Sequence, residues 1–478
     1  MASETTALGT PATETGQPEL KRAIGPKLLL FFVIGDILGT GIYALVGSVA
    51  GQIGGALWLP FLIAFIVAGF TAFSYLELVG KYPKAAGAAL YTNRAFRLPI
   101  LTFLVAFLVM CSGITSASTA AKAFAGTYLN YFLSWPVLPV AIGFIVLLAL
   151  VNFRGVGESV KANVVLTIIE LSGLAIIIVI GIFAAAEGKG DPSRLLEIDT
   201  GSTSTLFAIT AATSLAFFAM VGFEDSVNMA EECKEPVRIF PRALLTGLAA
   251  AGFIYVLVAV TSSLLVETKV LSGAKSSALL KVIEIGAPGF PLWVFSAIGL
   301  FAVINSALIN MLMASRLLYG MANERIIPQQ FATVHPSRRS PWVAILFTSL
   351  IAVALVSTVD DLSVLGGTTA LLLLMVFTIV NIAVLVLRKE QAEHKHFRAP
   401  TIFPILGAIT SAYLAIPGLS GRPWEQYKVA GILLIVGLAL WVINRLFVGK
   451  VEFDPANWAR ADPAVEFALG GENPSYQI

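Results

Sequence analysis

The chain has 478 residues, of which 57% are hydrophobic and 13% are charged. Soluble domains carry about 25% charged residues, so this composition excludes an ordinary soluble protein and indicates a chain that crosses a membrane many times. The formal net charge of +2 at pH 7 comes from basic residues scattered between apolar segments, and we therefore expect no nucleic-acid partner.

At about 20 residues for each membrane crossing, the apolar segments predict an all-α protein with twelve transmembrane helices. The expected helices cover residues 25–50, 56–80, 95–120, 135–153, 157–186, 205–231, 241–267, 289–319, 341–359, 363–388, 402–420 and 427–448. Roughly three quarters of the 31 Lys and Arg residues fall in the tails and on one side of these helices. This bias predicts a plasma-membrane protein with both termini in the cytoplasm.

The expected helices form one membrane core between two polar tails. The expected divisions are 1–22, a disordered cytoplasmic tail; 23–400, the core, with helices 1–5 at 24–186 and helices 6–10 at 204–388; 401–448, helices 11 and 12; and 449–478, a cytoplasmic C-terminal tail.

The first expected helix is interrupted. Residues 31–47 read FFVIGDILGTGIYALVG, which places glycine and Asp36 where a membrane helix is normally continuous and apolar. Non-helical backbone survives at this depth only where it lines a cavity or is buried in protein. Helix packing is the alternative interpretation, because Gly35 and Gly39 also form a small-residue packing motif.

The end of the second helix and the middle of the fifth carry further charges. Glu77, Lys81 and Lys84 are expected to form ion pairs at the inner mouth that break when the protein opens inward. Glu170 lies at the midpoint of the fifth helix. An ionisable residue at this depth in the membrane is energetically costly, so a functional role is the first hypothesis for it. Its carboxyl group is suited to carry a proton near neutral pH or to bind sodium, and a structural acid bonded to a neighbouring helix is the third possibility.

The sixth expected helix repeats the interruption of the first. Residues 214–232 read SLAFFAMVGFEDSVNMAEE. Two interrupted spans in corresponding halves are the best sequence indication of a transporter's central binding site. The first ten helices form two blocks, helices 1–5 and helices 6–10. Because each block holds an odd number of helices, the second block enters the membrane from the opposite side, which predicts an inverted repeat.

Two interrupted helices offer complementary polar groups. The N-terminal end of a half-helix favours an anion, whereas free carbonyls favour a cation. Amino acids carry both charges about one residue apart, so an amino acid is the expected substrate. The expected groups are the amides of Gly39, Thr40 and Gly41 for the carboxylate, and the carbonyls around Phe218, Ala219 and Val221 for the ammonium.

Other polar residues near the breaks have open roles. Glu224 and Asp225 follow the second break, where at least one is expected to receive an ammonium side chain or to form an inner gate. If Asp36 and Glu170 face one cavity, repulsion between them keeps one protonated. All three histidines fall in expected loops, and no zinc, P-loop or nucleophile-elbow motif occurs, so we expect no metal, no cofactor and no enzymatic activity.

Four segments resemble a known family. GDILGTGIY at 35–43, SYLELVGKYPKAAGAALY at 74–91, FFAMVGFEDSVNMAEECKEPVRIFPRA at 217–243 and NSALINMLMASRLLYGMANERIIP at 305–328 are similar to motifs of the amino acid–polyamine–organocation superfamily. Within it, the chain looks like bacterial relatives of cationic amino acid transporters. The resemblance implies a LeuT-type fold, a 5+5 inverted repeat of twelve helices with helices 1 and 6 unwound in mid-membrane, which works by alternating access.

The same resemblance implies particular site residues. By motif, the residues that would bind the backbone of the substrate are Ile37, Thr40, Gly41, Phe218, Ala219 and Val221. Apart from the resemblance, Phe223 and Glu224 beside the second break are also expected to bind the substrate. The cation site of the family would be formed by the carbonyls of Gly35 and Leu38 with Ala302, Asn305 and Ser306. The acids Asp36 and Glu170 are expected to join this site because they are charged residues within the membrane. The chain departs from the family at Asp36, where a small apolar residue is usual, and at Glu170, where proton-coupled relatives often carry lysine. Proton symport is favoured, and the alternatives are sodium symport, amino acid exchange and polyamine transport.

Overall fold

The computed structural model describes residues 24–83, 87–154, 160–199, 201, 203–323, 325–338, 340–390 and 394–448, without the side chains of 160–162, 228, 229, 231, 232 and 448. The expected tails and Lys84 lie outside the described residues. All regular elements in these ranges are helical, which confirms the all-α prediction for them.

Sixteen α-helices are found in the described ranges. They are α1 (Pro26–Ile37), α2 (Thr40–Ile53), α3 (Trp58–Lys81), α4 (Gly87–Phe96), α5 (Pro99–Ala123), α6 (Val137–Phe153), α7 (Val160–Ala186), α8 (Thr205–Ala216), α9 (Pro236–Leu265), α10 (Thr268–Ala274), α11 (Ala278–Gly286), α12 (Leu292–Asn323), α13 (Trp342–Thr358), α14 (Leu362–Leu387), α15 (Ile402–Ala415) and α16 (Trp424–Val448). Within the same ranges, nine helical segments are long and apolar enough to cross a membrane, and α6, α13 and α15 are shorter apolar helices. Each of the twelve predicted ranges overlaps one of these segments.

Several helix ends differ from the prediction for local reasons. Helix α9 begins at Pro236, five residues before the predicted start, because proline at the first helical position lacks only an N–H that has no intrahelical partner there. Helix α15 ends at Ala415 instead of residue 420, since the chain turns at Gly418 with φ +80°. The short helix α4 was not predicted, because most of its ten residues are small or polar.

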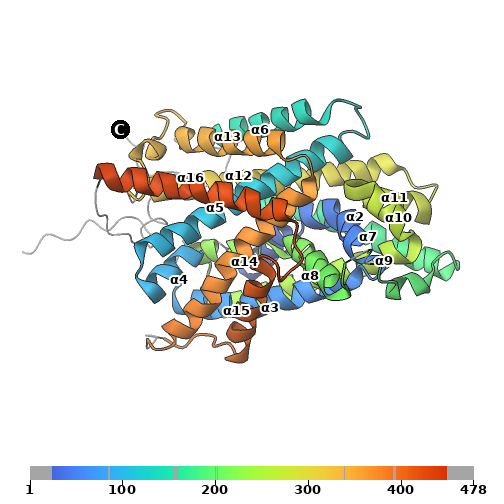
Figure 1. The fold of residues 1–478 in the computed structure, drawn as a ribbon, viewed down its shortest axis with the longest axis horizontal. Coiled ribbons are helices and arrows are strands. Elements are labelled where there is room, and N and C mark those ends of the chain that lie inside the picture. Colours follow the sequence, from blue (N-terminus) through green and yellow to red (C-terminus); the bar gives the residue numbers. More distant parts are fainter. Residues whose placement is uncertain are drawn as a thin grey trace, which may run out of the picture.

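The two interrupted helices lie in the interior of the bundle. Helix α9 packs against α1 and α3, α2 packs against α8, and α5 packs against α12 and α14. Helix α4 lies at one end of the bundle and α10 and α11 lie at the other, as Figure 1 shows. The latter two form from the segment 267–288, and α10 packs against α2.

An arginine joins the helices next to the second interruption. Arg422 lies between α15 and α16 and is 8% exposed. Its guanidinium donates to the carbonyl of Leu414 at 2.7 Å, to that of Gly367 at 2.8 Å and to that of Ser214 at 3.3 Å. Burial lowers the pKa of Arg422 to about 10, so the group stays charged at neutral pH. It therefore fixes the C-terminal part of α8 against α14 and α15.

A buried ion pair joins α3 to the end of α14. The Arg388 guanidinium donates to both oxygens of Glu77, at 2.7 and 2.6 Å, and the Ala399 amide donates to the same carboxylate at 2.9 Å. Glu77 was predicted to form an ion pair, and it does. Lys81 was predicted to pair as well, but it donates instead to the carbonyl of Leu387, the last residue of α14, and to that of Glu390.

Replacing Arg388 with methionine is expected to lower the free energy of unfolding by about 3–5 kcal/mol, because it leaves the Glu77 carboxylate buried without its cation. The side chains of Arg388 and Glu77 are only 11% and 5% exposed. Chemical denaturation in detergent micelles measures the loss.

The matched control is Arg97→Met, whose ion pair with Glu390 spans 3.9 Å between side chains 84% and 43% exposed. It is expected to change the free energy by less than about 1 kcal/mol. Equal losses in the two variants would show that the Glu77–Arg388 pair contributes no more than a surface contact. Combining Arg388→Met with Glu77→Gln should recover part of the stability.

Candidate functional site

The first interruption is short. Helix α1 ends at Ile37, Leu38 has extended backbone with ψ 120°, and α2 begins at Thr40. Gly39 has φ 179°, which any residue can adopt, so its backbone conformation does not require glycine. What matters is the absence of a side chain. A Cβ at Gly39 would lie 3.2 Å from the side chain of Ser306 in α12. The N-terminal amides of α2, which lack intrahelical partners, therefore begin in the interior of the bundle.

The second interruption is longer. Helix α8 ends at Ala216, a 3-10 turn covers Phe217–Met220, and Val221 has extended backbone. Gly222 has φ +125°, a conformation that favours glycine. The chain then continues as a 3-10 segment, Asp225–Glu232, where the sequence predicted membrane helix up to residue 231.

The two interruptions contact each other directly. A Cβ at Gly41 would collide with the Cα of Ala219 and lie 2.9 Å from its amide nitrogen. A Cβ at Gly222 would lie 2.5 Å from the carbonyl oxygen of Asp36. The absence of a side chain at Gly41 and at Gly222 thus allows the backbones of the two interrupted helices to approach within van der Waals distance.

Polar groups hold the backbone at both interruptions. The Tyr255 hydroxyl of α9 donates to the carbonyl of Ile37 at 2.7 Å. The Gly222 amide donates to a carboxylate oxygen of Glu224 at 2.9 Å, and Glu224 is 6% exposed. The Thr40 hydroxyl is buried and has no hydrogen-bond partner among the described residues. A buried hydroxyl of this kind is suited to a ligand group, because buried polar groups normally find partners.

Glu170 of α7 lies in a polar cluster with α2 and α12. Its side-chain oxygen accepts a hydrogen bond from the Asn305 amide at 3.0 Å, and its backbone carbonyl accepts one from the Tyr43 hydroxyl at 2.6 Å. Glu170 is 0% exposed and Asn305 is 1% exposed. Ala302 lies one turn before Asn305 on the same helix and is also buried.

The backbone of the first interruption lies beside this cluster. Ser306 follows Asn305 and contacts Gly39, and Gly35 packs against Asn163 and Thr167 of α7. The structure therefore brings Gly35, Glu170, Asn305 and Ser306 to one region. The contact at Gly35 also fits the packing interpretation of the small-residue motif. The predicted shared cavity for Asp36 and Glu170 stays a prediction.

The remaining predicted residues surround the two interruptions. Phe218 packs near Leu45 of α2 and Gly366 of α14. The ring of Phe223 lies edge-on to Tyr75 of α3, with centroids 5.9 Å apart. These rings close the space around the second interruption with aromatic surface.

The sequence interpretation missed three residues of this region. Tyr43 and Tyr255 lie within apolar spans, and a buried tyrosine hydroxyl normally requires a partner, which was an available signal. Gly222 was part of a quoted motif, but its positive φ and its contact with Asp36 needed the three-dimensional structure. Within the described residues, no group of three or more His, Cys, Asp or Glu side chains is placed to hold a metal ion.

Comparisons with known proteins cover nearly the whole chain. A family model described as amino acid permease matches residues 24–441. The branched-chain amino acid permease of Bacillus subtilis is 23% identical over 457 residues, covering 90% of this chain and 95% of that protein. The methylthioribose transporter of the same species is 25% identical over 457 residues, covering 91% and 94%. Cationic amino acid transporter 4 of Mus musculus is 27% identical over 435 residues, covering 86% and 65%.

Proposed function

Since the chain belongs to the amino acid permease family, as its motifs indicated, we propose that it is a secondary active amino acid transporter of the plasma membrane. The contact between the two interruptions, at Gly41 with Ala219 and at Gly222 with Asp36, carries the proposal. Paired interruptions of this kind, in corresponding halves, mark the central binding site of many secondary transporters.

The proposed architecture is the LeuT-type arrangement. Twelve helices cross the membrane, the first ten form the 5+5 inverted repeat, and helices 1 and 6 are unwound in mid-membrane. The interruption at Leu38 and Gly39 and the one that begins after Ala216 support this arrangement, because they occur in the first helix of each block. Both termini lie in the cytoplasm, and the lipid bilayer is the partner of the outer helices.

The proposed substrate lies between the two interruptions. The amides of Thr40 and Gly41 at the start of α2, together with the Thr40 hydroxyl, bind the carboxylate. The carbonyls of Phe218, Ala219 and Val221 bind the ammonium group. Glu224 was expected to receive an ammonium side chain or to form an inner gate, but its bond to the Gly222 amide favours a role in fixing the second interruption.

Proton symport by alternating access is the proposed mechanism. Glu170 carries the proton, because its side chain is buried and titratable and its cluster meets the first interruption through Ser306 and Gly39. Sodium symport remains the alternative, with the Glu170 carboxylate and oxygen atoms of Gly35, Leu38 and Ser306 as ligands. Amino acid exchange and polyamine transport are further alternatives within the same fold.

Uptake by the purified protein in proteoliposomes tests this proposal. A panel of branched-chain, cationic and other amino acids, with putrescine and methylthioribose added, is offered under imposed proton or sodium gradients. We expect uptake of at least one amino acid that an inward proton gradient stimulates and that protein-free liposomes lack.

Each alternative has its own outcome in this assay. Uptake that depends on amino acid inside the liposomes would show exchange. Uptake driven only by a sodium gradient would show that sodium, and not the proton, is the coupling ion. Uptake of putrescine in competition with amino acids would favour an amine permease. No transport or exchange of any amino acid or amine would refute the proposed function.

A further inference from the structure

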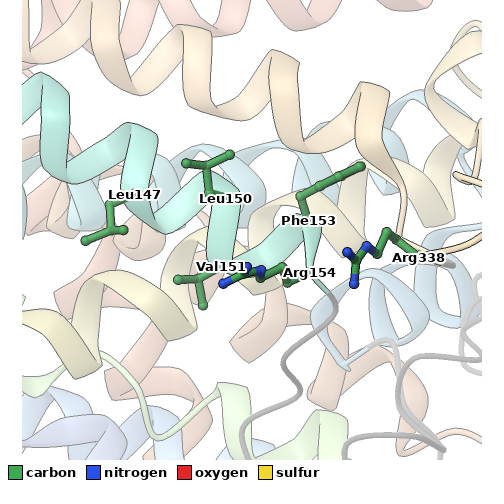
Figure 2. A pocket seen from close by; sticks show the side chains of 6 residues that line it. All are labelled: Leu147, Leu150, Val151, Phe153, Arg154 and Arg338. Carbon is green, nitrogen blue, oxygen red and sulfur yellow. The ribbon is translucent and has the colours of Figure 1, made fainter.

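A groove on the outer helices lies apart from the two interruptions. It has a volume of about 320 Å³ and is lined by Leu147, Leu150, Val151, Phe153, Arg154 and Arg338. Figure 2 shows five of these side chains along α6 and its end, with Arg338 on the adjoining connection. None of these residues belongs to the proposed substrate or ion site, so the groove needs an explanation of its own.

One face of α6 forms the apolar wall of the groove. Leu147, Leu150, Val151 and Arg154 follow one another at spacings of three, one and three residues, which places them on the same side of a helix. Leu147 and Leu150 are each 56% exposed. Helix α6 lies beside α13 at the edge of the bundle, as Figure 1 shows, so this wall faces the lipid of the membrane.

Two arginines lie at one end of the apolar wall. Arg154 directly follows the last residue of α6, where the apolar stretch ends and the membrane–water boundary is expected. Arg338 comes from the connection between α12 and α13. Among the described residues, neither guanidinium has an acidic partner in an ion pair.

The connection that carries Arg338 is fixed to the end of α6. The Ser340 hydroxyl, buried in the structure, donates to the carbonyl of Phe153 at 2.8 Å. The ring of His335 lies edge-on to the ring of Phe153, with centroids 5.1 Å apart. The backbone amide of Arg338 donates to the His335 ring at 3.4 Å. These contacts hold the connection that carries Arg338 against the end of α6, next to Arg154.

We propose that this groove binds one anionic phospholipid. The guanidinium groups of Arg154 and Arg338 bind the phosphate, for which arginine provides several donors in a fixed geometry. An acyl chain lies along the apolar wall, which extends about 10 Å from Arg154 to Leu147 at 1.5 Å for each helical residue. Basic pockets between membrane helices bind anionic headgroups in this way.

The combination of charge and apolar surface selects the lipid among possible anions. A free phosphate would use the two arginines but not the wall formed by Leu147 and Leu150. A zwitterionic lipid would use the wall, but its headgroup brings a positive charge to the arginines. In the proposed orientation of the transporter, the groove opens to the cytoplasmic leaflet; the binding itself does not depend on the direction of transport.

Native mass spectrometry of the full-length protein in detergent tests the groove. Phosphatidylglycerol and phosphatidylcholine with the same acyl chains are titrated separately, and glycerol phosphate serves as the headgroup without chains. We expect one phosphatidylglycerol molecule to bind the wild type more tightly than phosphatidylcholine. At about 1 kcal/mol for each arginine near an anionic headgroup, the double variant Arg154→Gln/Arg338→Gln should bind phosphatidylglycerol about 30-fold more weakly.

Arg445→Gln is the matched control, because Arg445 is an exposed arginine in the last turn of α16 and does not line the groove. It should keep wild-type lipid affinity. Both variants change exposed side chains, and size-exclusion chromatography confirms that they are folded. Equal affinity for the two lipids, unchanged binding in the double variant, or glycerol phosphate binding as tightly as phosphatidylglycerol would each overturn the proposal.

Discussion

Replacing Gly41 with alanine is expected to abolish transport and to weaken substrate binding by up to about 100-fold. The added Cβ would collide with the Cα of Ala219 and lie 2.9 Å from its nitrogen. Overpacking of this kind costs up to about 3 kcal/mol, which corresponds to a factor of about 100 in affinity. The neighbouring atoms are backbone and move only if the second interruption moves.

Binding and transport are measured separately for this variant. A thermal shift with the substrate found in the uptake panel reports binding, and proteoliposome uptake reports transport. Gly69→Ala is the matched control, because a Cβ at Gly69 in α3 meets no atom within 4 Å. It should transport like the wild type and be slightly more stable, since alanine favours a helix over glycine by about 1 kcal/mol.

The outcome of this experiment shows whether the contact of Gly41 with Ala219 belongs to the substrate site. If Gly41→Ala folds, as shown by size-exclusion chromatography, and loses binding, the contact between the interruptions forms the substrate site. Wild-type affinity in the folded variant would refute the assignment of substrate between α2 and the 3-10 turn. Gly222→Ala should behave like Gly41→Ala, because its Cβ would lie 2.5 Å from the Asp36 carbonyl and its φ is +125°.

The sequence predicted the features that depend on residues close together in the chain. Apolar length located each membrane segment, and glycine near an acid located both interruptions, because these signals depend on residues close in sequence. The extent of the second interruption was less predictable. The prediction continued the membrane helix to residue 231, but Asp225–Glu232 is mostly polar and forms 3-10 turns where it packs against α1 and α3.

Partners far apart in sequence were the part that could not be predicted. Glu77 was expected to form an ion pair, but its partner Arg388 lies 311 positions away and only the packing of α14 against α3 brings them together. Tyr255 lies 218 positions from Ile37. Nothing in the local sequence of either residue selects its partner, because each depends on which helices are neighbours.

Glu170 is a residue whose position was evident in the sequence but whose partners were not. In the sequence it is an acid in an apolar segment, with proton carrier, sodium ligand and structural acid as open roles. In the structure its carboxylate accepts the Asn305 amide, and its own carbonyl accepts the Tyr43 hydroxyl from α2. The acid is thus connected to the half-helix that begins at the proposed substrate site, so a change in its charge can influence that half-helix.

Replacing Glu170 with glutamine is therefore expected to keep substrate binding and to remove accumulation driven by a pH gradient. Glutamine has nearly the same size and retains an oxygen that accepts the Asn305 amide, but it does not titrate. With one proton for each substrate, a gradient of one pH unit supports about tenfold accumulation. The variant should instead equilibrate its substrate across the membrane while still exchanging internal for external substrate.

Concentrative uptake into proteoliposomes at several external pH values measures this difference. Glu284→Gln is the matched control, since Glu284 pairs with Lys281 on α11 with half of its side chain exposed. It should accumulate substrate like the wild type. If Glu170→Gln accumulates substrate normally at every pH, the proton is carried elsewhere and Glu170 is a structural acid. If accumulation by the wild type follows a sodium gradient and the variant loses that response, Glu170 acts as a sodium ligand, because the same buried oxygen atoms serve either ion.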